Sequence, residues 1–191
     1  DGSASIRPFV ADGSVAAVVE VLAGVSRVTS PGRPVTAAAG GATARTVRTE
    51  SVGALPREVH DLLSEMPLVT GFRTADGSQQ PGQGRTVLCV VSDGVPADLP
   101  TDRPVALAVL AAPSARDVLA PGAPETTAWV PVGERGSQSA YSLLMDDEPA
   151  LRDVVAGLLR AVLPAESTPR SRLAEPVGLD SDLTVLRTRM P

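Results

Sequence analysis

Residues 86–94 read TVLCVVSDG, an apolar run of strand length followed by the turn signal Ser92-Asp93-Gly94. A second run, PVALAVLA at residues 104–111, has the same character. Neither run alternates between apolar and polar residues, which indicates strands that are covered on both faces, as in a parallel sheet. The two runs therefore predict two buried strands of a parallel sheet.

Segments with helical spacing of apolar residues alternate with the strand-like runs. The predicted helices cover residues 12–25, 55–66, 114–119 and 148–163. Weaker strand patterns cover residues 35–39, 43–49 and 127–132. Strands that alternate with helices predict an α/β fold, with a doubly wound, mostly parallel sheet and helices on both faces.

The length and composition predict one domain with a tail. The chain has 191 residues, 43% of them hydrophobic, which is enough for one compact core. We expect a single α/β domain over residues 1–163. Residues 164–191 are expected to be a C-terminal tail, whose Leu183, Val185 and Leu186 add a strand or dock on the domain.

Charge and residue usage exclude several kinds of partner and site. The net charge is −5 and no basic stripe is present, which disfavours nucleic acid as a partner. One cysteine excludes an internal disulfide and a cysteine-based zinc cluster, and one histidine excludes a His-rich metal site. No apolar run is long enough to span a membrane, and no signal peptide is visible. The single cysteine suits a reducing or an oxidising compartment, with the cytoplasm slightly favoured.

Three polar segments are expected to meet at the carboxyl edge of the sheet, where open α/β sheets bind their ligands. They are Asp1-Gly2-Ser3-Ala4-Ser5 before the first helix, residues 46–51 before the second, and residues 92–94 at the end of the most apolar strand. They offer carboxylates and hydroxyls and no soft ligand. Such oxygen donors suit Mg²⁺, Ca²⁺ or Mn²⁺ and not zinc.

The same segments resemble the von Willebrand factor A domain. DGSAS at residues 1–5 matches the Asp-x-Ser-x-Ser signature of that family, and VVSDG at residues 90–94 is similar to its apolar strand that ends in Asp-Gly. The resemblance implies a metal-ion-dependent adhesion site. Asp1, Ser3 and Ser5 would form the first ligand group and Asp93 the last. Family members carry an apolar strand just before this signature, so that strand lies upstream of Asp1 or comes from elsewhere.

The family also supplies a threonine from a loop between the two motifs. Thr49 is the first choice here, because Thr49-Glu50-Ser51, followed by Gly53-Ala54-Leu55, resembles the threonine loop that leads into a helix. Thr43 and Thr46 compete with Thr49. Thr70 is a more distant choice.

The expected function is that of a non-enzymatic protein-interaction module. Mg²⁺ or Mn²⁺ would be held by Asp1, Ser3, Ser5, Thr49 and Asp93, with one coordination position open for an acidic side chain of a protein partner. The first alternative is a metal-free structural or assembly domain of a larger complex. The second is a hydrolase that uses Asp93 or Asp1 as a carboxylate base, ranked last because no second catalytic group accompanies them. The oligomeric state is not predicted.

The remaining reactive side chains have simpler interpretations. His60 follows the inward-facing Val59 of a predicted helix and is expected at the surface or its boundary. Cys89 stands inside an apolar strand and is expected to be a buried structural thiol. At these positions, neither the histidine nor the cysteine favours nucleophilic catalysis.

Overall fold

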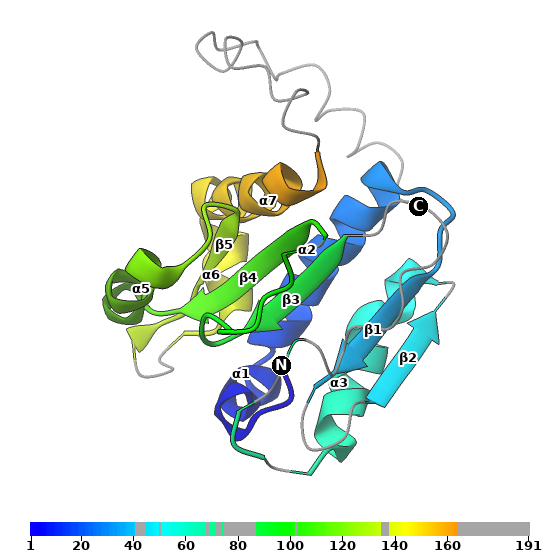
Figure 1. Ribbon diagram of the computed structural model, residues 1–191, viewed down its shortest axis with the longest axis horizontal. Helices are drawn as coiled ribbons and strands as arrows, with labels where there is room; N and C mark the ends of the chain where they lie inside the picture. Colours follow the sequence, from blue (N-terminus) through cyan, green and yellow to red (C-terminus); the bar gives the residue numbers. More distant parts are fainter. Residues whose placement is uncertain are drawn as a thin grey trace, which may run out of the picture.

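The computed structural model describes residues 1–40, 45–49, 51–67, 69–71, 74, 87–101, 103–134 and 138–163. At its centre lies a three-stranded parallel sheet with the strand order β3-β4-β5 (Figure 1). The strands are β3 (Leu88–Ser92), β4 (Val105–Ala111) and β5 (Thr127–Pro131). Leu88 pairs with Val105 and Leu107 pairs with Thr127, so β4 is the middle strand.

Helices precede, connect and follow these strands. The α-helices are α1 (Arg7–Ala11), α2 (Ser14–Thr29), α3 (Leu55–Glu65), α5 (Pro113–Leu119), α6 (Ala140–Asp146) and α7 (Glu148–Val162). Short 3-10 helices are η1 (Ala4–Ile6), η2 (Val52–Ala54) and η3 (Ala120–Gly122). Local sequence explains the ends: Asp12 accepts a hydrogen bond from the Ser14 N–H at the start of α2, and Asp147 accepts one from the Ala150 N–H at the start of α7.

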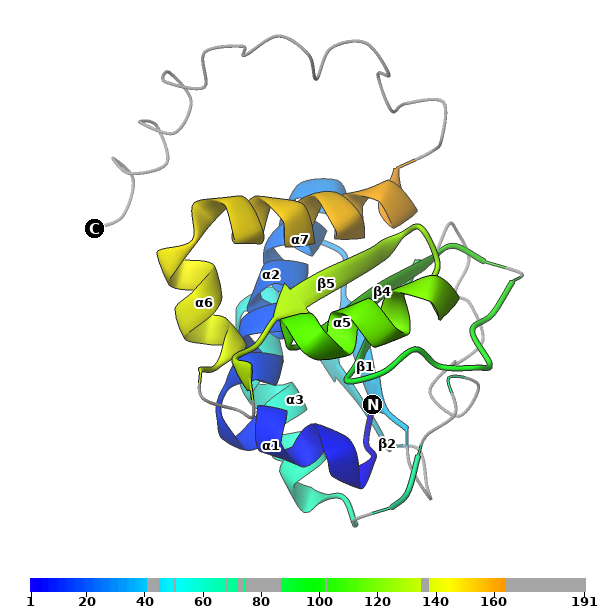
Figure 2. The same cartoon turned by 90° about the vertical axis from the view of Figure 1, so that its left-hand side faces the viewer.

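The sheet is covered on both faces, as the unbroken apolar sequence of β4 predicts. Ala106, Ala108 and Leu110 belong to the larger core, which also contains buried residues of α2 and α7. Leu107, Val109 and Ala111 point the other way, into a smaller cluster that includes Leu119 of α5 and Trp129 of β5. Figure 2 shows α7 lying along one face of the sheet and α5 on the other side.

Helix α7 comes unusually close to strand β5 at Gly157. A Cβ atom at this position would lie 2.9 Å from both the Cα and the Cβ of Ala128. Ordinary contacts between carbon atoms begin at about 3.5 Å, so glycine lets the helix sit this close to the strand. Val154 and Leu158, 0% and 1% exposed, fill the same interface.

Strands β1 (Val35–Ala39) and β2 (Arg45–Thr49) form a separate antiparallel pair, in which Val35 pairs with Thr49 and Ala39 with Arg45. The pair packs on α3 and lies on the β3 side of the parallel sheet, with the N-terminus beside it (Figure 1). The predicted strands at residues 35–39 and 43–49 are thus present, with the second beginning at Arg45 among the described residues.

The structure confirms an α/β fold in its coarse form, a parallel sheet flanked by helices. The predicted helix at residues 12–25 runs instead from Ser14 to Thr29, and helices α1 and α6 were not predicted. Both missed helices are short, so the periodic signal within each is weak. The expected tail at residues 164–191 lies outside the described residues.

Within the described part of the chain, no single helix is long and apolar enough to cross a membrane. The segments Ala4–Ala11 and Ser14–Thr29 meet the length and composition criteria only as a pair, and they are bent by 80° relative to each other.

Candidate functional site

Two distant segments of the chain meet at the carboxyl end of β3. One is the N-terminal segment that precedes η1, and the other is the end of β3 with the residue that follows it. Together they form a cluster of oxygen-bearing side chains, which we call the Asp1–Asp93 cluster. It consists of Asp1, Ser3, Ser5, Ser92 and Asp93.

Hydrogen bonds link every member of this cluster. The Ser92 hydroxyl donates to Oδ2 of Asp1 at 2.8 Å, and the Ser5 hydroxyl donates to Oδ1 of Asp93 at 3.2 Å. The Oγ atoms of Ser3 and Ser5 lie 2.9 Å apart, and the Ser3 N–H donates to Oδ1 of Asp1 at 2.7 Å. The structure therefore brings together four of the five residues predicted for the site: Asp1, Ser3, Ser5 and Asp93.

The backbone of the N-terminal segment is held on three sides. The Asp1 amino group donates to the carbonyl oxygen of Val91 at 2.9 Å, and the Ala4 N–H donates to that of Val69 at 2.7 Å. Gly2 lies so close to Gly40 that a Cβ atom on Gly2 would be 2.2 Å from the Gly40 carbonyl oxygen. These contacts fix the cluster between β3, the end of β1 and the segment that follows α3.

The cluster is partly shielded and carries two carboxylates. Ser3 and Ser92 are each 2% exposed, whereas Ser5 is exposed. Burial lowers the pKa of the Asp1 amino group to about 6, and the nearby Asp93 carboxylate acts in the opposite direction. The ion pairs found in the described part of the structure involve neither Asp1 nor Asp93. The two carboxylates are therefore linked to each other through Ser3 and Ser5, without an ion pair to an arginine among the described residues.

Thr49 lies away from this cluster. Its hydroxyl donates to the carbonyl oxygen of Ser51 and accepts from the Ser51 N–H, which forms a local turn. Thr49 pairs with Val35, at the opposite end of β1 from the Gly40 that Gly2 touches. Five residues of strand separate the two ends by about 16 Å. The prediction that Thr49 joins Asp1 at one site thus finds no contact to support it.

The other threonines considered are placed differently. Thr43 lies outside the described residues, and Thr46 is exposed on β2 opposite Ala38. Thr70 is exposed and directly follows Val69, whose carbonyl oxygen accepts the Ala4 N–H. The guanidinium of Arg7 also donates to the carbonyl oxygen of Met66, so the segment after α3 is tied to the N-terminal segment at two points.

The donor set is one of hard oxygen atoms. No group of three or more His, Cys, Asp and Glu side chains able to hold a metal occurs among the residues that the structure describes. The Asp1–Asp93 cluster instead combines two carboxylates with the hydroxyls of three serines. Carboxylates and hydroxyls suit Mg²⁺, Mn²⁺ or Ca²⁺ and give zinc none of its preferred nitrogen or sulfur ligands.

Sequence reasoning missed Ser92 as a member of the cluster. Ser92 is the last residue of β3, and its hydroxyl also accepts the N–H of Gly94 at 3.2 Å, which closes the turn after the strand. A signal was present, because Ser92 lies next to Asp93 in the turn that was itself predicted to be at the site. Ser92 was not singled out because serine is common in turns, so its presence there did not indicate a contact with Asp1.

His60 and Cys89 lie on other elements. His60 is exposed on α3, as predicted. The prediction that Cys89 is buried is wrong, because β3 is the outer strand of the parallel sheet and Cys89 is exposed there. Desolvation by the surrounding protein nevertheless raises the pKa of its thiol to about 11. The accessible thiol is therefore protonated at neutral pH, when it is a poor nucleophile.

No protein-family model, curated protein or solved structure was found to match the chain. A proposal for its function therefore depends on the residues of the chain itself.

Proposed function

We propose that the chain is a protein-interaction module with a von Willebrand factor A-like, doubly wound fold, which binds an acidic group of a protein partner through Mg²⁺ or Mn²⁺. One observation carries the proposal: the side chains of DGSAS and of the SDG turn, about 90 residues apart in the sequence, are joined by hydrogen bonds at the carboxyl end of β3. Those are the two motifs on which the family resemblance depends.

The composition of the cluster supports a divalent cation. Two carboxylates at one site repel each other, and a bound cation would remove that repulsion. Asp1 and Asp93 would supply the negative charge, and Ser3 and Ser5 would supply neutral oxygens, directly or through water. Ser92 would position the carboxylate of Asp1, because its hydroxyl already donates to Oδ2.

Thr70 replaces Thr49 as the threonine of the proposed site. The Val69 carbonyl oxygen is bonded to the Ala4 N–H, inside the Asp-x-Ser-x-Ser segment, so the next residue along lies beside that segment. Thr49 is held in a turn at the far end of the antiparallel pair. Thr70 is also exposed, as a ligand at an open rim must be.

An acidic partner group would complete the coordination of the cation. The chain has a net charge of −5, so an acidic surface would be repelled from it without a counter-ion. A divalent cation beside the exposed Ser5 would reverse the sign of the local charge. Binding of an acidic peptide or protein should therefore require the metal.

Thermal unfolding of the 191-residue chain tests the metal directly. A ligand at 100 times its Kd stabilises the folded state by about 2.7 kcal/mol, which for a domain of this size raises Tm by roughly 5–10 °C. We expect such a rise with millimolar Mg²⁺ or Mn²⁺ and its reversal by excess EDTA. A Tm that is the same in EDTA and in either metal would favour the metal-free assembly domain instead.

Matched variants locate the cation. Asp93→Asn should abolish the metal-dependent rise in Tm, whereas Asp153→Asn, which removes the same charge from the exposed side of α7, should preserve it. Thr70→Ala should reduce the rise and Thr49→Ala should leave it intact. If Thr49→Ala reduces the metal-dependent rise in Tm and Thr70→Ala does not, Thr49 and not Thr70 is the threonine of the site.

A further inference from the structure

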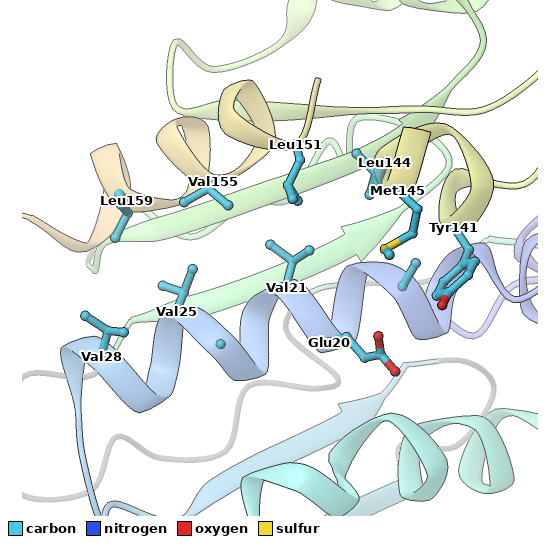
Figure 3. A pocket seen from close by; sticks show the side chains of 12 residues that line it. Glu20, Val21, Val25, Val28, Tyr141, Leu144, Met145, Leu151, Val155 and Leu159 are labelled. Carbon is cyan, nitrogen blue, oxygen red and sulfur yellow. The ribbon is translucent and has the colours of Figure 1, made fainter. Parts of the chain in front are cut away.

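An apolar groove with a volume of about 550 Å³ runs between α2 and the pair α6 and α7. Figure 3 shows two facing rows of side chains along it: Val21, Val25 and Val28 on α2 and Leu151, Val155 and Leu159 on α7. Much of this surface is open to solvent, since Val28 is 82% exposed and Met145, at the other end, is 67% exposed.

We propose that the C-terminal segment Leu179–Met190 of the same chain docks in this groove as an amphipathic helix. Leu179, Leu183, Leu186 and Met190 are spaced by four, three and four residues, which places them on one face of a helix. Val185 is the apolar residue off that face. Asp180 lies in the first turn of this segment and Arg187 and Arg189 lie in its last turn, the ends at which the helix dipole favours negative and positive charge respectively.

The dimensions of segment and groove agree. The α2 side of the groove extends from Ala17 to Val28, and at 1.5 Å per residue this is about 16 Å. A helix from Leu179 to Met190 has the same length of about 16 Å. Four apolar side chains spaced along it can therefore meet the apolar rows over the full length of the groove.

The exit point of the chain sets the direction of docking. Helix α7 ends at Val162, one turn beyond Leu159, and Leu159 and Val28 lie at the same end of the groove (Figure 3). Residues 164–178 span up to about 50 Å when extended, which is ample for a return to that end. A short connection thus favours a helix antiparallel to α7, with Leu179 beside Val28 and Leu159.

Charge complementarity supports this direction. Glu20 is the charged residue that lines the groove, at the end occupied by Tyr141 and Met145 (Figure 3). In the antiparallel orientation Arg187 and Arg189 reach that end. A tethered segment also needs only modest intrinsic affinity, because the connection keeps it at a high effective concentration.

Hydrogen exchange on the full chain, read by mass spectrometry, tests the docking. The double variant Leu183→Asp, Leu186→Asp removes the apolar face of the segment and leaves residues 1–163 unchanged. We expect exchange in peptides covering Ala17–Val28 to accelerate about tenfold or more in this variant, since the groove becomes exposed. The control Thr184→Asp, Thr188→Asp adds the same charge on the opposite face of the segment and should exchange as the wild type does.

Sedimentation velocity on the same samples identifies the occupant. A monomeric wild type that shows the difference in exchange supports docking within one chain. Equal exchange in all three proteins overturns the proposal, and so does protection that appears only with a dimeric mass, because a second copy would then fill the groove. The sequence of residues 1–163 is the same in all three proteins, and the control variant carries the same added charge, so a difference between the two variants reports on the apolar face of the segment.

Discussion

Replacing Gly157 with alanine should destabilise the protein, although alanine is the better helix former. Helix propensity alone favours alanine by about 1 kcal/mol. The added Cβ would meet the Cα and Cβ of Ala128 at 2.9 Å, about 0.6 Å inside an ordinary carbon contact. Overpacking of this kind costs about 1–3 kcal/mol, and a cost in the upper half of that range, less the gain in propensity, lowers the free energy of unfolding by a net value of about 1–2 kcal/mol.

We expect a cost in the upper half of the overpacking range because the atoms that the new Cβ meets belong to the backbone and Cβ of Ala128. Ala128 is 1% exposed and belongs to β5, which is hydrogen-bonded to β4 along its length. The strand cannot move away as the tip of a flexible side chain would. Helix α7 would have to shift outward instead and would loosen the packing of Val154 and Leu158.

A matched variant in the same helix isolates the propensity contribution. Ala156 is the neighbouring residue and is exposed, so Ala156→Gly should lower the free energy of unfolding by about 1 kcal/mol from propensity alone. Urea unfolding followed by far-UV circular dichroism and by the fluorescence of Trp129, which adjoins Ala128, measures both variants. If Gly157→Ala raises the free energy of unfolding by as much as Ala156→Gly lowers it, the close approach of α7 to β5 is refuted.

Two further substitutions test the attachment of the site and the start of α7. Gly2→Ala places a Cβ that overlaps the Gly40 carbonyl oxygen and should lower the unfolding free energy, measured in urea, by about 1–3 kcal/mol. Gly94→Ala, whose Cβ meets nothing within 4 Å, should change it little, and equal effects of the two variants would contradict the contact between Gly2 and Gly40. Asp147→Ala removes the cap bond to the Ala150 N–H at 3.2 Å and should lower Tm by about 2–4 °C, as expected for about 1 kcal/mol, while Asp146→Ala, beside it, should leave Tm nearly unchanged.

The elements with strong local patterns were predictable from the sequence. Strands β3 and β4 are continuous apolar runs, and α7 has a capping aspartate, a proline in its first turn and a regular apolar stripe. Helix α6 has no comparable pattern, because it is short and depends on a distant partner. The buried hydroxyl of Ser14 accepts the N–H of Ala140 at 2.8 Å, a contact between residues far apart in the chain. A contact of this kind produces no periodic pattern in the sequence, so it could not be predicted.

The proximity of the site residues was predictable only in part. Asp1 and Asp93 were expected together because each belongs to a local motif whose place on an α/β sheet follows from its own strand or helix. The threonine has no such motif. Thr70, the threonine of the proposed site, lies on the segment after α3, which the hydrogen bond between Ala4 and Val69 joins to the N-terminal segment. Thr49 had the more persuasive neighbouring sequence, but in the register of β1 and β2 it pairs with Val35, at the opposite end of β1 from Gly40.

The contacts that position the cluster are made through the backbone. The Asp1 amino group bonds to Val91, the Ala4 N–H bonds to Val69, and Gly2 packs on Gly40, all through the backbone. These backbone contacts hold the side-chain oxygens close together, so the proposed cation would not have to repay the entropy of assembling them. The proposed cation would then add to stability by mass action and would not be required for folding. EDTA should therefore lower Tm only to that of the metal-free chain while leaving the circular dichroism of the folded state unchanged; unfolding by EDTA at 25 °C would mean that a cation organises the cluster and that the backbone contacts do not suffice.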